Sequence, residues 1–224
     1  MCAALVLFSY VYRKGDVATM EYRTLRKIAD AEFTERRSRF IGHAFPVQTE
    51  EEAVAYIKEL RTQYWDATHN VYAYVLRSGA MRYSDDGEPQ GTSGMPTLEV
   101  LTKGGITDAL IVTTRYFGGI LLGGGGLVRA YSRAAHDAVQ AAGIAVMRMC
   151  RMCTASCAYA QYNTVSRILE QNGAVIDDTS YGADITVRFH ILPALLPKLT
   201  QALADATAGS VVPQGESEAY LPCD

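Results

Sequence analysis

The sequence predicts an α+β protein built from two domains. Apolar residues recur at helical spacing in some segments and alternate in others, so helices and strands are interleaved along the 224 residues. Residues 1–150 carry 17 basic and 16 acidic side chains, whereas residues 151–224 carry 4 and 8. This change of charge accompanies a change of pattern, and we expect one domain over 20–148 and a second over 151–224.

The first domain is expected to alternate strands with helices. A capping box, Thr49-Glu50-Glu51-Glu52, opens a helix with an apolar face, and a longer helix ends at Gly143. The inward faces are predicted to carry Ala53, Ile57, Leu60 and Tyr64 in the former, and Leu127, Tyr131, Ala134, Ala135, Ala138 and Ala142 in the latter. The expected elements are strands over 38–47, 70–77 and 109–114, and helices from 50, over 97–103 and from about 127 to 142.

The second domain has a clearer order of elements. We expect strands over 154–159, 174–180, 184–191 and 210–215, and helices over 162–171 and from Pro193. The resulting order βαββαβ is the ferredoxin-like arrangement. That fold hosts many unrelated functions, so the order alone predicts no activity.

Composition indicates a cytoplasmic protein. No apolar run approaches the roughly 20 residues that span a bilayer. We interpret residues 1–19 as a peripheral extension, or as a consequence of start-site choice, because Met20 begins a more polar segment. The five cysteines include Cys150, Cys153 and Cys157, which are better read as small buried residues than as zinc ligands, since no histidine lies nearby. No metal and no cofactor are expected.

The stretch from Arg115 to Arg129 contains six glycines and joins a strand pattern to a helix pattern. Free N–H groups at a helix start attract anions, and the two flanking arginines would reinforce a phosphate site. The alternative is a tight crossover whose glycines only permit close packing. Neither a P-loop nor a dinucleotide-binding pattern is present.

A second glycine-rich segment over 79–96 is expected to be a long functional loop. Its carboxylates Asp85, Asp86 and Glu88 could hold Mg²⁺ or serve as acid and base, but turn formation is the favoured reading. Thr92-Ser93-Gly94 is expected to cap a helix and to provide a second start with free N–H donors.

Several other polar side chains could serve either a structural or a functional role. His69, beside Asn70, is more often a hydrogen-bonded structural histidine than a catalyst. Tyr116 and the other tyrosines could stack on unpaired bases, although most fit a core or rim. The basic run over 36–39 is either a contact patch or a charged edge strand, and the second reading is slightly favoured.

Several motifs together resemble one family, the Impact family in its bacterial YigZ form, over about residues 20–220. They are, in order, Ser38-Arg39-Phe40-Ile41-Gly42, Ala67-Thr68-His69-Asn70, Ser84-Asp85-Asp86-Gly87-Glu88-Pro89, Gly91-Thr92, Arg115-Tyr116-Phe117-Gly118-Gly119 and Gly126-Leu127-Val128-Arg129-Ala130-Tyr131.

The resemblance implies an N-terminal α/β sandwich similar to domain IV of elongation factor G, and a ferredoxin-like C-terminal domain similar to its domain V. Eukaryotic relatives are implicated in translational control, but their partner-binding amino-terminal domain has no counterpart here. Met95 stands where family members often carry a basic residue, which removes one possible phosphate contact.

The leading hypothesis is a cytoplasmic binding protein that engages RNA or ribosome-associated machinery. The alternative is an enzyme acting on a phosphorylated small molecule or nucleotide with a divalent ion, and a third reading is a protein-binding adaptor. The candidate anion or nucleic-acid contacts are His69, Ser84, Asp85, Asp86, Glu88, Thr92, Arg115, Tyr116, Phe117, Gly118, Gly119, Gly123, Gly124, Gly125, Gly126 and Arg129.

Overall fold

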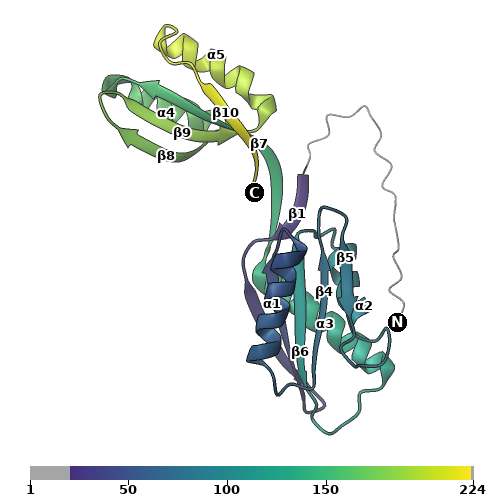
Figure 1. Ribbon diagram of the computed structural model, residues 1–224. Coiled ribbons are helices and arrows are strands. Elements are labelled where there is room, and N and C mark those ends of the chain that lie inside the picture. The colour runs from purple at the N-terminus through teal and green to yellow at the C-terminus, as the bar shows by residue number, and fades with distance from the viewer. Residues whose placement is uncertain (1–20, 223–224) are drawn as a thin grey trace, which may run out of the picture.

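The computed structural model describes residues 21–222, which form two five-stranded sheets flanked by helices (Figure 1). The expectation for residues 1–19 lies outside this range. The two sheets occupy opposite ends of an elongated molecule, and one long strand, β7 (Ile144–Cys157), runs from the first unit into the second. The predicted combination of two α+β units is therefore observed.

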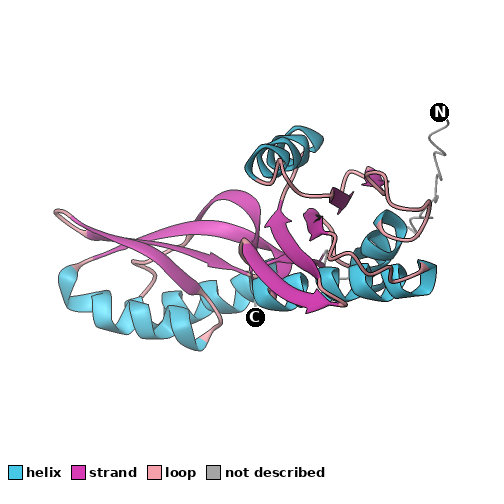
Figure 2. Cartoon of the chain, turned by 90° about the horizontal axis from the view of Figure 1, so that it is seen from below, coloured by secondary structure: helices cyan, strands magenta, loops and turns pink. Residues whose placement is uncertain are grey.

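The N-terminal sheet is antiparallel throughout and is covered on both faces. One face packs on α1 (Glu50–Gln63), and the other packs on α2 (Gly94–Lys103) and α3 (Gly124–Ala142). Figure 2 shows the strands lying between these helices. The strand order is β2 (Ala29–Glu35), β3 (Ser38–Pro46), β6 (Ala109–Tyr116), β4 (His69–Val75) and β5 (Met81–Ser84).

The predicted apolar faces of α1 and α3 are buried, with Tyr64 only partly so. Thr49 caps α1, since its hydroxyl accepts from the Glu52 amide at 3.2 Å.

Two predictions were wrong in extent. The α3 helix begins three residues before Leu127, because glycines carry no apolar period that marks a helix start. β5 lies inside the segment expected to be loop, because its side chains are largely exposed and show no alternation of buried and exposed positions.

The C-terminal unit has the predicted βαββαβ order. Its strands pair as β10 (Gln214–Pro222), β7, β9 (Ile185–Ile191) and β8 (Val175–Tyr181), all antiparallel. The helices α4 (Tyr162–Gln171) and α5 (Leu196–Thr207) pack in one core against this sheet. The last strand begins at Gln214 instead of 210, because residues 210–213 form an irregular segment that contains Pro213.

The two units share strand β7, where the sequence suggested a boundary near 150. The first residues of β7 pair with β1 (Glu21–Leu25), its middle pairs with β10 and its last part pairs with β9. Arg148 and Arg151 interrupt the apolar pattern, but each forms a cross-strand ion pair, with Glu21 and Glu218. The Arg77 guanidinium also lies 4.4 Å from the ring centres of both Tyr22 in β1 and Tyr220 in β10.

Cys150, Cys153 and Cys157 are buried, as small apolar residues would be. Burial raises the pKa of the Cys153 and Cys157 thiols, so both favour the uncharged form. Within residues 21–222 no group of three potential metal-ligating side chains is found. None of the helices in that range is long and apolar enough to cross a membrane.

Candidate binding surface at the loop end

Four connecting segments meet at the end of the N-terminal unit that lies farthest from the second unit (Figure 1). We call this region the loop end. It comprises the β2–β3 hairpin tip over 35–38, the α1–β4 connection over 64–68, the β5–α2 loop over 85–93 and the β6–α3 loop over 117–123.

Hydrogen bonds from backbone amides join three of these segments, the hairpin tip, the α1–β4 connection and the β6–α3 loop. The Phe117 amide donates to the Thr68 hydroxyl at 3.0 Å, and the Gly118 amide donates to the Ser38 hydroxyl at 3.2 Å. The Thr68 amide in turn donates to the Arg115 carbonyl at 2.9 Å. The segments with sequence motifs therefore come together in space, although they are widely separated along the chain.

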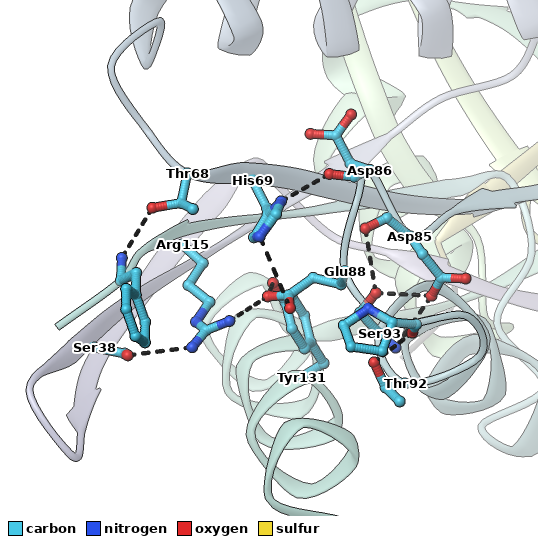
Figure 3. Close-up of polar contacts among 12 residues, drawn as sticks. Ser38, Thr68, His69, Asp85, Asp86, Glu88, Thr92, Ser93, Arg115 and Tyr131 are labelled. Atoms are coloured by element: carbon cyan, nitrogen blue, oxygen red, sulfur yellow. Dashed lines mark hydrogen bonds and ion pairs between the residues drawn. The ribbon is translucent and has the colours of Figure 1, made fainter. Parts of the chain in front are cut away.

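A buried polar network lies beneath the loop end (Figure 3). One carboxylate oxygen of Glu88 accepts from the guanidinium of Arg115 and, at 2.7 Å, from the hydroxyl of Tyr131. The side chains of Glu88 and Arg115 are only 3% and 5% exposed, so this ion pair is almost fully removed from water. Burial, together with the neighbouring carboxylate, raises the pKa of Tyr131, which therefore stays a neutral donor.

This network changes the interpretation of Arg115 and His69. The sequence suggested that both side chains contact phosphate, but Arg115 is buried against Glu88, with its guanidinium 5.4 and 5.5 Å from the ring centres of Phe40 and Phe117. His69 is partly buried, with one ring nitrogen 2.8 Å from the Asp86 carbonyl and the other 3.8 Å from Glu88. Both side chains therefore support the loops from the protein interior. The two terminal nitrogens of Arg115 donate to Glu88 and Ser38, and both ring nitrogens of His69 face polar partners, while Nε of Arg115 is buried without a hydrogen-bond partner in the described part of the chain.

Asp85 caps the start of α2. Its carboxylate accepts from the amides of Gly91, Ser93 and Gly94 and from the Ser93 hydroxyl, at 2.7–3.2 Å. Partial burial opposes ionisation of this carboxyl, but the four hydrogen bonds outweigh that effect and hold the pKa of Asp85 below its ordinary value. The α2 start is thus occupied by the protein itself, whereas the sequence suggested free donors there.

The three carboxylates of the 85–93 loop point to different partners. Asp85 faces α2, and Glu88 faces Arg115. Asp86 accepts from the Asn70 amide at 2.7 Å and from Arg61 at 2.6 Å, while its own amide donates to the Ser84 hydroxyl at 3.1 Å. Turn chemistry and internal pairing therefore account for all three carboxylates, and for Ser84.

The start of α3 is open. The first helical hydrogen bond runs from the Leu127 amide to the Gly123 carbonyl at 2.9 Å, so the outward amides are those of 124–126 and not the Leu127 amide that the sequence suggested. Gly124 and Gly125 are exposed, and the structure gives no partner for the three amides preceding Leu127. Gly123 makes the turn into the helix with a φ of 73°, which a side chain would strain.

Two candidate residues border this open start. Thr92 is half-buried, and its methyl group is 3.9 Å from the position that a Cβ of residue 124 would occupy. Arg129 is exposed, and its guanidinium is 3.7 Å from the corresponding position at Gly125. The structure describes no carboxylate paired with Arg129. The glycine-rich turn and the 85–93 loop therefore do meet, at the α3 start.

The remaining predicted residues shape the β6–α3 loop. Tyr116 donates to Asp66 at 2.8 Å, and the Phe117 ring is 45% exposed. Gly118 is required by close contact, since a Cβ there would lie 2.1 Å from the Arg37 carbonyl oxygen. Gly119 has a φ of 83°.

Sequence reasoning missed three contributors to this region. Tyr131 was expected as a core residue of α3 or as a stacking surface, but its hydroxyl donates to Glu88 in the buried network. Ser38 receives hydrogen bonds from Arg115 and Gly118, and Trp65, within the 64–68 connection, is 81% exposed. Ser38 and Tyr131 lie in sequence motifs that could have identified them as contributors, whereas no motif surrounds Trp65.

Comparisons with known proteins agree with the sequence motifs. Residues 36–139 match the family described as Impact N-terminal domain, and residues 156–210 match a domain of unknown function, DUF1949. The chain is 33% identical to IMPACT family member YvyE of Bacillus subtilis over 198 residues, 87% of this chain and 91% of that protein. It is also 33% identical to IMPACT family member YigZ of Escherichia coli over 180 residues, 79% of this chain and 88% of that protein.

Similarity to a eukaryotic relative is confined to part of the chain. The Protein IMPACT homolog of Dictyostelium discoideum is 41% identical over 97 residues, 41% of this chain and 28% of that protein. A crystal structure described as that of a hypothetical protein is similar with a TM-score of 0.56 and 29% identity, covering 88% of this chain and 98% of that one.

Proposed function

The chain belongs to the IMPACT family, and from this membership and the chemistry of the loop end we propose that it is a cytoplasmic binding protein in translational regulation that engages RNA. The fold-level likeness to domains IV and V of elongation factor G, which the family resemblance implies, stays a prediction. It is consistent with a partner in the translation machinery, although fold alone carries no function.

The observation that carries this proposal is the contrast in charge at the loop end. The carboxylates Asp85, Asp86 and Glu88 are engaged by internal donors, so they do not neutralise the cation at the α3 start. Arg129, Gly124 and Gly125 are exposed, Gly126 is half-buried, and within residues 21–222 the amides of 124–126 have no hydrogen-bond partner. Outward amides combined with a guanidinium are suited to bind a phosphate group.

A matched pair of variants at Gly125 tests the contact. Gly125→Glu places a carboxylate in the first turn of α3, while Gly125→Ala makes the same backbone change without charge. We expect Gly125→Glu and Arg129→Ala each to weaken RNA binding about tenfold, the effect of losing a charge-assisted hydrogen bond, and Gly125→Ala to leave binding unchanged. Fluorescence anisotropy with structured and single-stranded RNA over a series of salt concentrations measures this.

Two results would contradict the proposal. One is the absence of salt-dependent RNA binding by the unaltered protein. The other is equal affinity in the glutamate and alanine variants, because the α3 start would then make no contact with the ligand.

The alternative enzyme function requires the carboxylates of the 85–93 loop to face a common ligand. They instead contact α2, Arg61 and Arg115, which lie in different directions. Thermal shift with nucleotides, with and without Mg²⁺, distinguishes the two functions, since an enzyme of this kind should be stabilised by millimolar ligand. Pull-down after nuclease treatment separates RNA binding from binding of a protein partner.

A further inference from the structure

The tip of the β2–β3 hairpin has an unusual backbone. Glu35 and Ser38 pair across the strands, so Arg36 and Arg37 alone make the turn, with φ angles of 45° and 62°. Positive φ at both central residues is what a type I′ turn requires, and Asn-Gly is the sequence that suits it best. Residues with a Cβ rarely adopt this conformation, so two arginines here suggest a use for their side chains.

Surrounding contacts hold the tip against the β6–α3 loop. The Arg37 carbonyl packs so closely on Gly118 that no side chain would fit at residue 118. The Arg36 guanidinium donates to the Leu121 carbonyl at 3.3 Å. The tip and the loop leading to α3 therefore form one unit. The Arg36 side chain is held on that loop, three residues before Gly124, and Arg37 is exposed at the tip.

The charges of this unit are not neutralised internally. Six other arginines in the N-terminal unit each pair with a carboxylate: Arg39, Arg61, Arg77, Arg82, Arg115 and Arg133. Within residues 21–222 no carboxylate pairs with Arg36, Arg37 or Arg129. At the loop end, these three arginines therefore keep a positive charge that an anionic partner can contact.

Protection of an edge strand does not explain the arginines at the tip. β2 is the edge strand, and it already carries Asp30, Glu32 and Glu35, which discourage pairing with another chain. A turn of Asn-Gly would complete the same hairpin without two arginines in the left-handed region. The placement of the arginines is better explained by a ligand.

We propose that Arg36 and Arg37 extend the contact surface at the α3 start and bind backbone phosphates of RNA. This inference rests on the proposed function and adds the hairpin tip to its binding residues. The two arginines and Arg129 would contact successive phosphates on either side of the glycine-rich loop, independently of base sequence.

The test separates stability from binding. In the double variant Arg36→Asn with Arg37→Gly, the turn gains its preferred sequence while losing both cations. We expect its Tm to rise, its RNA affinity to fall at least about tenfold, and the slope of log K against log salt to decrease by about one to two. The matched control is Arg167→Gln with Arg188→Gln, which removes two exposed arginines from the C-terminal unit and should change affinity by less than about twofold.

Each outcome is decisive. A higher Tm with unaltered affinity overturns the role of the tip but leaves the proposed function standing, provided that the Gly125→Glu variant still loses binding. A lower Tm overturns the strain argument, since the contacts of the arginines, including the Arg36–Leu121 hydrogen bond, would then stabilise the tip by more than its backbone conformation costs. An equal loss of affinity in the control double variant overturns the inference, because net charge alone would explain the binding.

Discussion

Two helices of the N-terminal unit begin next to each other, and they differ in what faces their first amides. Both α2 and α3 start at a glycine, Gly94 and Gly124, and neither has a side-chain cap from its own N-cap residue. At α2 the carboxylate of Asp85 accepts from the first amides, whereas at α3 the amides of 124–126 have no hydrogen-bond partner in the described part of the chain. A glycine-rich helix start is therefore not a binding site in itself, because a neighbouring carboxylate can take the place of a ligand.

The largest expected effect concerns Glu88, which ties the two starts together. It lies in the loop before α2 and accepts from Tyr131 of α3, while its charge is paired with buried Arg115. Glu88→Ala leaves that guanidinium buried and unpaired, so we expect the free energy of unfolding to fall by about 3–5 kcal/mol in urea denaturation. The double variant Glu88→Leu with Arg115→Met removes both charges, so its free energy of unfolding should fall by less than that of Glu88→Ala. A single variant as stable as the unaltered protein would contradict the role of this pair.

The next effect concerns the start of α2, where the contribution of the Asp85 carboxylate to stability should depend on pH. The folded-state pKa of Asp85 lies below its unfolded value, so the stabilisation is present above the unfolded pKa and is lost as pH falls through the folded one. Asp85→Asn should lower the free energy of unfolding by about 1.5–3 kcal/mol near neutral pH. Below about pH 4 the difference in the free energy of unfolding between this variant and the unaltered protein should become smaller. Denaturation curves that differ by the same amount at every pH would count against charge-based capping.

The smallest effects compare the first residue of each helix. At Gly94 an added Cβ would lie 2.8 Å from the Ser84 carbonyl oxygen, whereas at Gly124 the nearest atom is 3.9 Å away, on Thr92. Gly94→Ala should therefore destabilise the fold by about 1–3 kcal/mol. Gly124→Ala should stabilise it by about 0.4–1 kcal/mol, because the unfolded chain loses freedom. Thermal unfolding measures the stability of both variants. If the Tm of both shifted in the same direction, the starts of α2 and α3 would be equally closely packed, contrary to this prediction.

Local features of the fold could be predicted well. The apolar faces of α1 and α3 and the order of elements in the C-terminal unit follow from side-chain periodicity, which is a local property. Strand β7 was not predicted as one element, because Arg148 and Arg151 break the pattern and only their partners on β1 and β10 make them compatible with a strand.

For the candidate site, the sequence identified the segments but not the role of each side chain. Arg115 was expected at the surface because it flanks the glycine run, yet Glu88, 27 residues earlier, removes it from solvent. Arg36 and Arg37 were more readily interpreted as edge charges, since the positive φ angles that set them apart are visible only in the folded hairpin.

By itself the sequence determined the family, the buried faces of α1 and α3 and the presence of a glycine-rich helix start, because motif order and periodicity are local properties of the chain. The tertiary structure decided which helix start stays open and which arginines keep their charge for a partner. The reason is physical: burial and pairing depend on loops that bring distant carboxylates to one guanidinium or helix start and away from another.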